Sequence, residues 1–172
     1  MKSKRSQIAQ VFIYILALFI FALILYYGTY SIYSFIKKGE EVVYIKFKTT
    51  LESEVEAILP QFGSVSIFNK NKPLKVPGKV EKVCFVSYDA VKNGERDAIT
   101  EEAGRYRPVI ELSVGARAEE NVFLLPIEER APISFLRIEV LYGFKCIPVK
   151  QGRLDIRLES KGNLVEITEY TE

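Results

Sequence analysis

The chain has 172 residues and a nearly balanced charge, with 24 lysines and arginines against 22 aspartates and glutamates. A net charge of +2 gives no indication of a binding surface for a polyanion, and no nucleic-acid partner is expected. The sequence contains no histidine. It therefore lacks the usual proton shuttle at neutral pH and the commonest zinc ligand, which excludes many classes of enzyme.

The first element along the chain is a long apolar run. Residues 11–36 read VFIYILALFIFALILYYGTYSIYSFI and include no charged side chain. A hydrocarbon core of about 30 Å needs about 20 such residues in a helix, and a helix satisfies its own main-chain groups there. Tyrosines gather at the end of the run, where an aromatic belt meets the headgroups. The sequence predicts a transmembrane helix over residues 7–38, in contact with membrane lipid.

Two other interpretations of this run are weaker. A secretory signal peptide has an apolar core of about 7 to 15 residues and small residues at its cleavage site. This run is longer and ends in tyrosines followed by Lys37 and Lys38. A buried helix of a soluble protein rarely stays uncharged over such a length.

The orientation follows from the flanking charges. Lys2, Lys4 and Arg5 precede the run, whereas Lys37 and Lys38 follow it. Because the more positive flank usually stays in the cytoplasm, we expect a cytoplasmic N-terminus in the cell membrane and an extracytoplasmic domain.

The segment 39–60 has two possible patterns. Residues 42–48 alternate as a strand would, but apolar residues also recur every three or four positions over a longer stretch, as on a helix. The helical pattern explains more of the segment, and Pro60 suits its end. The sequence predicts an amphipathic stalk helix over residues 39–60, separated from the first helix by a short break at Gly39. Its packing stripe consists of Val43, Phe47, Leu51 and Val55.

The remainder, residues 61–172, is expected to form a small β-rich head, which makes the fold class α+β. Three strands are predicted within residues 64–68, 80–89 and 121–127. An exposed loop is predicted over residues 90–106, followed by a short helix that begins near Pro108. The segments FLRIEV, FKCIPV, RLDIRLE and LVEIT are short and closely spaced, which predicts an antiparallel meander. In RLDIRLE, apolar and charged residues alternate strictly, which predicts a sheet with one face exposed to solvent.

Motifs that carry chemistry are missing from the sequence. Neither a phosphate loop of the form GxxxxGK[ST] nor a nucleophile elbow GxSxG occurs. Acidic residues occur in pairs beside lysines and arginines, which is typical of a solvated surface rather than of a shielded catalytic cleft. We expect no catalytic residue, no cofactor and no metal.

The two cysteines, Cys84 and Cys146, both lie in predicted strands. A disulfide between them would stabilise a small domain by roughly 2 to 5 kcal/mol, and an extracytoplasmic location permits it. The alternative is a pair of buried thiols that pack as small apolar groups. The sequence leaves both open, because it does not show that the two strands are neighbours.

The segment KRSQIAQVFIYIL resembles the start of an archaeal type IV pilin-like precursor, in which a short basic leader is cut just before a glutamine. The resemblance implies cleavage between Ser6 and Gln7, which removes residues 1–6. Val11 stands where such precursors often carry a glutamate that aids packing between subunits. The resemblance therefore leaves assembly into a filament open.

The rest of the chain is similar to a group of archaeal membrane-anchored proteins that share four segments. These are FGSV after the long helix, a V-C-F-V strand, an NVFLL strand and a late cysteine strand leading into GRLDIRLE. Here they fall at residues 62–65, 83–86, 121–125 and from Cys146 onward. The similarity implies the layout of helix and β head and brings no activity with it.

The function expected from these features is a non-catalytic, pilin-like surface protein, such as a minor pilus subunit that meets like subunits through its N-terminal helix. The alternative is a monomeric single-pass protein that binds a partner or serves as an accessory subunit of a larger membrane complex.

Overall fold

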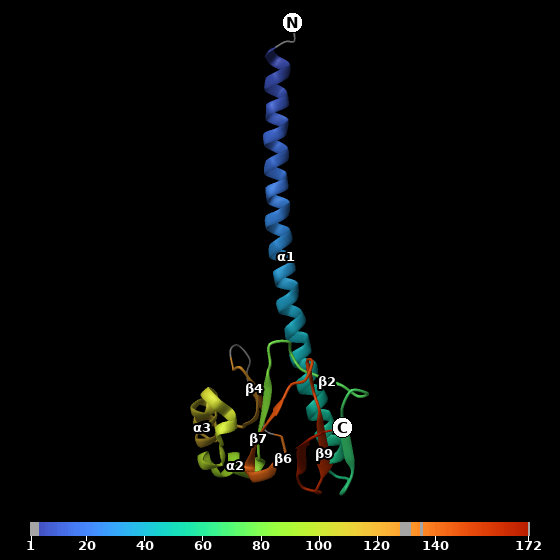
Figure 1. Ribbon diagram of the computed structural model, residues 1–172, viewed down its shortest axis with the longest axis vertical. Coiled ribbons are helices and arrows are strands. Elements are labelled where there is room, and N and C mark those ends of the chain that lie inside the picture. Colours follow the sequence, from blue (N-terminus) through green and yellow to red (C-terminus); the bar gives the residue numbers. More distant parts are fainter. Residues whose placement is uncertain (1–3, 128–131, 135, 172) are drawn as a thin grey trace. The chain divides into compact units, whose positions relative to one another are not determined.

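The computed structural model describes residues 4–127, 132–134 and 136–171. The chain divides into two compact units, Met1–Glu41 and Val42–Glu172. The architecture is α+β, as predicted: a long N-terminal helix is followed by small sheets, three of them within the described residues (Figure 1).

Helix α1 extends from Lys4 to Ile58 and continues through Gly39 without a break. The predicted interruption at Gly39 is therefore wrong. A glycine inside a helix costs only about 1 kcal/mol relative to alanine, and the helical hydrogen bonds on both sides outweigh that cost. The residues from Val42 onward belong to the same compact unit as the β head, so the second part of α1 is a component of the head.

Among the described residues, the head contains ten short strands. Their bounds are β1 Val65–Phe68, β2 Leu74–Lys75, β3 Lys82–Val86, β4 Glu120–Leu125, β5 Ile133–Ser134, β6 Ile138–Glu139, β7 Phe144–Pro148, β8 Arg153–Leu154, β9 Ile156–Ser160 and β10 Val165–Glu169. They form a four-stranded sheet in the order β1-β9-β10-β6, called the β9 sheet here, and another in the order β5-β4-β3-β7, called the β3 sheet. Strands β2 and β8 form a separate pair.

The predicted antiparallel meander of the last four strands is wrong. Only β9 and β10 form a hairpin, whereas β6 pairs with β10 in parallel and β7 pairs with β3 in the other sheet. The strands themselves lie where their sequence patterns predict. In β8 and β9, Leu154, Ile156 and Leu158 are fully buried, as the alternation predicts.

The β3 sheet is covered on both faces. Val83 and Phe85 of β3 belong to one apolar cluster, while Cys84 and Val86 belong to a second. Strand β4 divides in the same way, because successive side chains of a strand point to opposite faces. This explains why the runs VCFV (83–86) and VFLL (122–125) are apolar throughout, in contrast to the alternating pattern of β9. In Figure 1, α2 and α3 lie to one side of β4 and β7.

The first cluster contains the buried face of α1. Phe47, Leu51 and Val55 are almost fully buried there, as the predicted stripe requires. Val43 is only half-buried and lies outside the cluster, whereas Tyr44 packs against it. At 100° per residue Val43 lies about 80° around the helix from the centre of the buried face. The prediction that Val43 belongs to the stripe is therefore wrong.

The segment predicted as an exposed loop is helical instead. It forms α2 (Tyr88–Asn93) and two 3₁₀ helices, η1 (Arg96–Ala98) and η2 (Glu101–Tyr106). Helix α3 (Arg107–Gly115) follows with its proline in the first turn, as predicted. These pieces are too short to show a helical period, and buried apolar side chains dock them on the β3 sheet. Those side chains are Ala90, Val91, Ile99, Ala103, Ile110 and Val114.

Two buried polar side chains organise the connections between strands. Asn121 lies at an irregularity in the pairing of β4 with β5, and its amide donates to Leu136 O and accepts from Leu136 N–H. The hydroxyl of Ser87 bonds both main-chain groups of Val140. Within the described residues, no buried side-chain nitrogen or oxygen lacks a hydrogen-bond partner.

Truncating the buried face of α1 should destabilise the head. Leu51→Ala removes a fully buried side chain, and we expect a loss of about 2 to 5 kcal/mol in the free energy of unfolding. The matched control is Ile45→Ala on the exposed side of the same helix, which should change it by less than about 0.5 kcal/mol. Urea titration of the full chain in detergent micelles measures both. Equal stability of the two variants would contradict this packing.

Candidate functional site

The largest exposed apolar surface lies on the N-terminal part of α1. Nearly every large side chain from Phe12 to Ile36 is exposed, and none of the most apolar window is buried inside the protein. Among the described residues, α1 is the single helix long and apolar enough to cross a membrane. Surface of this kind is unfavourable in water by about 25 cal/mol for each Å².

One of the few polar side chains in this segment is satisfied within the helix itself. The hydroxyl of Thr29 lies 2.9 Å from Leu25 O and 3.0 Å from Tyr26 O, one turn back. A hydroxyl bonded in this way needs no water. This part of α1 is therefore compatible with hydrocarbon in both its side chains and its main chain.

The predicted cleavage position, between Ser6 and Gln7, falls in the helical main chain at the beginning of α1. Residues 1–3 of the predicted leader lie outside the described residues. Processing at this position stays a prediction.

A polar cluster ties α1 to the first strand. Glu54 accepts hydrogen bonds from Lys72 Nζ at 2.6 Å and from the Ser66 hydroxyl at 2.7 Å, and Lys72 Nζ also lies 4.9 Å from the centre of the Phe68 ring. Burial by itself would raise the pKa of Glu54. The hydrogen bonds from Lys72 and Ser66 and the charge of Lys72 outweigh burial and leave that pKa below its ordinary value.

Cys84 and Cys146 form a disulfide. The two residues face each other directly in the register of β3 and β7, so the pairing that the sequence left open is resolved by long-range strand topology. Both residues belong to the second apolar cluster, between the β3 sheet and the short helices. The bond connects an internal strand of the sheet to its edge strand.

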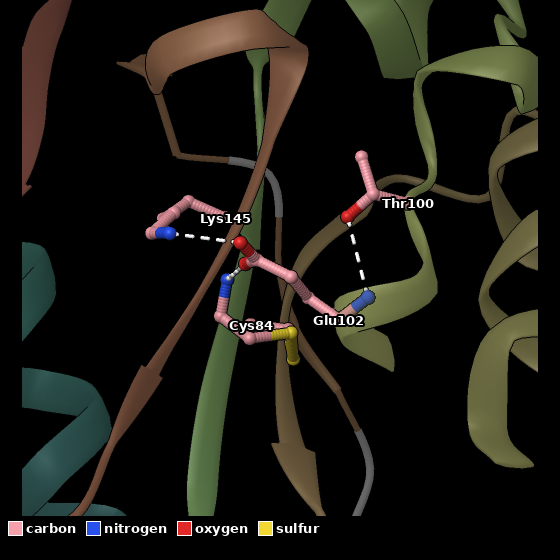
Figure 2. The surroundings of a disulfide bond; sticks show 5 residues. Cys84, Thr100, Glu102 and Lys145 are labelled. Atoms are coloured by element: carbon pink, nitrogen blue, oxygen red, sulfur yellow. Dashed lines mark hydrogen bonds and ion pairs between the residues drawn. A yellow bond between two sulfur atoms is a disulfide. The ribbon is translucent and has the colours of Figure 1, made fainter. Parts of the chain in front are cut away.

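A carboxylate lies beside this disulfide. Glu102 Oε2 accepts the main-chain N–H of Cys146 at 2.9 Å, and Glu102 Oε1 accepts Lys145 Nζ at 2.8 Å (Figure 2). Burial opposes ionisation of Glu102, but the hydrogen bonds from Cys146 and Lys145, with the charges of Lys145 and Lys82, lower its pKa below the ordinary value. Glu102 is therefore ionised at neutral pH.

A hollow of about 210 Å³ lies next to Glu102, between η2 and the ends of β3 and β4. Its charged groups are balanced, with Glu81 and Glu102 against Lys82 and Arg105. Both oxygens of Glu102 already accept hydrogen bonds, and Arg105 donates to the hydroxyl of Tyr106. The hollow therefore offers no pair of free carboxylates of the kind that acid–base catalysis requires.

The remaining acidic side chains of the described residues are not grouped as metal ligands. No cluster of three or more acidic or cysteine side chains that could hold an ion occurs among the described residues. Several carboxylates instead pair with a neighbouring base. Examples are Glu111 with Arg107, Glu159 with Lys161 and Glu169 with Lys150.

Sequence reasoning missed the roles of Glu54 and Glu102. Both were assigned to a solvated surface because they occur among other charged residues. What distinguishes each is a partner far away in the sequence, Lys72 for Glu54 and the Cys146 main chain for Glu102. Nothing in the local pattern separates Glu102 from its neighbour Glu101, and both are exposed.

The chain matches no family model, no curated protein and no solved structure.

The cluster at Glu54 should contribute to the pH dependence of stability. The pKa of Glu54 is lower in the folded head than in the unfolded chain. Its contribution to the free energy of unfolding is therefore complete at pH values above its unfolded-state pKa and is lost as the pH falls through its folded-state pKa. Glu54→Gln should therefore lower stability at pH 7, by less than about 1 kcal/mol for a partly exposed pair, and should flatten the loss between about pH 5 and pH 3.

Urea titrations at a series of pH values measure this effect. Glu56→Gln is the matched control, because Glu56 is an exposed carboxyl two residues along the same helix. If Glu54→Gln and the wild type lose stability in parallel on acidification, the assigned role of Glu54 is wrong.

Proposed function

We propose that this chain is a non-catalytic, pilin-like surface protein held in the cell membrane by the N-terminal part of α1. The observation that carries the proposal is the apolar segment from Phe12 to Ile36, in which nearly every large side chain is exposed, followed in the same helix by the buried face at Phe47, Leu51 and Val55. One helix thus supplies both a surface suited to hydrocarbon and part of the core of the head.

Two features support an extracytoplasmic head. The basic residues before the apolar segment slightly outnumber those after it, and the more positive flank usually stays in the cytoplasm. The disulfide Cys84–Cys146 also supports this side of the membrane, because disulfides persist in oxidising compartments and are rare in the cytosol.

The pilin-like part of the proposal is supported by the resemblance of the first residues. A basic hexapeptide MKSKRS precedes Gln7 and an apolar helix, which is the order of a leader cut ahead of its helix. After such a cut, Gln7 becomes the first residue and the apolar segment is free to meet lipid or the same segment of like subunits.

A second candidate is a monomeric single-pass protein that acts as an accessory subunit of a larger membrane complex. Val11 favours it, because an apolar residue stands where pilin-like precursors often carry a glutamate. The exposed Leu141 and Tyr142 on the head offer a place for a foreign partner. Crosslinking in intact membranes distinguishes the two candidates, since like subunits give a ladder of multiples and an accessory subunit gives one foreign adduct.

The mass of the mature chain tests the pilin-like proposal. Protein extracted from the membranes of a host with a type IV prepilin peptidase should begin at Gln7 and should lack residues 1–6. Gln7→Asp, which places an acid at the cleavage position, should leave the leader attached while the protein stays in the membrane fraction. A wild-type chain that retains its leader in the presence of active peptidase would contradict pilin-type processing.

A further inference from the structure

One short segment covers the disulfide. Ile99 and Ala103 are buried in the same apolar cluster as Cys84 and Cys146, and η2 lies against β7. We call residues 99–106 the η2 cover. Cys84 has no exposed surface and Cys146 retains 7%. The cover therefore lies between the two sulfur atoms and any reagent in the solvent.

Besides its buried apolar side chains, the cover has a polar attachment to the edge strand of the β3 sheet through Glu102. Ser87 N–H donates to Gly143 O and Val149 N–H donates to Glu81 O. Gly143 and Val149 therefore point their main-chain groups toward β3. Because such groups point alternately toward the neighbouring strand and away from it in an antiparallel edge strand, Cys146 N–H points away from β3. Its acceptor is Glu102 of the cover (Figure 2). Glu102 also accepts from Lys145, the adjacent residue of the same strand.

The other attachments of the cover are the buried Ile99 and Ala103 and the ion pair of Glu101 with Arg107 of α3. The remaining residues of its middle, Glu102 and Gly104 with Arg105, are exposed. Gly104 divides η2 with a main-chain conformation (φ 56°, ψ −134°) that glycine alone adopts without strain. Segments with few buried contacts open locally at a smaller free-energy cost than global unfolding requires. The cover can therefore open at lower cost than the unfolding of the sheet beneath it.

We propose that Glu102 latches the η2 cover over the Cys84–Cys146 disulfide, so that a thiol reductant reaches the bond through local opening of the cover while the rest of the head stays folded. The disulfide is then a gated redox switch rather than an inert staple. This inference is independent of the proposed function, because it concerns the head alone.

The chemistry is ordinary exchange with a dithiol. Once the cover is open, a thiolate of the dithiol attacks Sγ of Cys146, the less buried of the two residues, and the bond to Cys84 breaks. The sulfur of Cys84 leaves with the electron pair and takes up a proton. The second thiol of the dithiol then attacks the mixed disulfide and releases Cys146. Two cysteine thiols and one oxidised, cyclic dithiol result, and β7 keeps only its hydrogen bonds to β3.

Reduction kinetics test the latch. The full chain in detergent micelles is treated with dithiothreitol at constant pH, quenched with an alkylating reagent and analysed by mass. Glu102→Ala should be reduced about threefold to fivefold faster than the wild type, the factor expected for the loss of a charge-assisted hydrogen bond that is partly exposed to solvent. The matched control is Glu101→Ala, which removes an exposed carboxylate of the same cover that pairs with Arg107, and its rate should equal that of the wild type.

A second variant changes Gly104, the residue that divides η2, instead of Glu102. Gly104→Ala leaves every contact of Glu102 in place, since no atom lies within 4 Å of the added Cβ, but it strains the closed main chain at positive φ. It should also accelerate reduction. Glu102→Gln keeps an oxygen for Cys146 N–H without the charge and should fall between the wild type and Glu102→Ala.

Global stability, measured by urea titration of each variant, separates local from global opening. The latch is supported if the reduction rate of a variant increases by more than its loss of global stability alone would cause. It is also supported if the reduction rate of the wild type rises only weakly with urea concentration, because local opening exposes little surface. Acceleration fully accounted for by global destabilisation would overturn the proposal. Equal rates for Glu102→Ala and Glu101→Ala would do the same.

Discussion

The structure depends on the exposed apolar surface of α1 between Phe12 and Ile36. A helix satisfies its own main-chain hydrogen bonds, so it is the form in which a single segment can lie in hydrocarbon. The same helix continues to Ile58, and its last turns place Phe47, Leu51 and Val55 in the core of the head. The exposed apolar segment and part of the head core therefore belong to one element, and a change in the buried face of α1 affects the folding of the head.

The head is built in layers around the β3 sheet. One face packs on α1 and the β9 sheet, and the other packs on the short helices α2, η2 and α3. The disulfide and Glu102 lie on this second side, at the edge strand β7. An edge strand exposes unpaired main-chain groups, and proteins commonly cover such groups with a loop or a helix. Glu102 covers one of them at Cys146, and Pro148 at the end of β7 has no N–H to cover.

The sequence predicts the local elements better than their partners. The helical period identifies the second part of α1, and the alternation at residues 153–159 identifies a strand with one buried face, because both patterns are local. The parallel pairing of β6 with β10 and the placement of β7 beside β3 leave no local trace. For the same reason the disulfide stayed open in the sequence and the roles of Glu54 and Glu102 were missed. The short helices between residues 88 and 106 lack a period and are held by packing.

We expect the N-terminal part of α1 to lie in a hydrocarbon environment, and extraction of cell membranes measures whether it does. The full chain should stay with the membrane fraction in high salt and in alkaline carbonate, and only detergent should release it. A full-length chain that remains monomeric in aqueous buffer without detergent would contradict this expectation, because nearly every large side chain between Phe12 and Ile36 would then be in water.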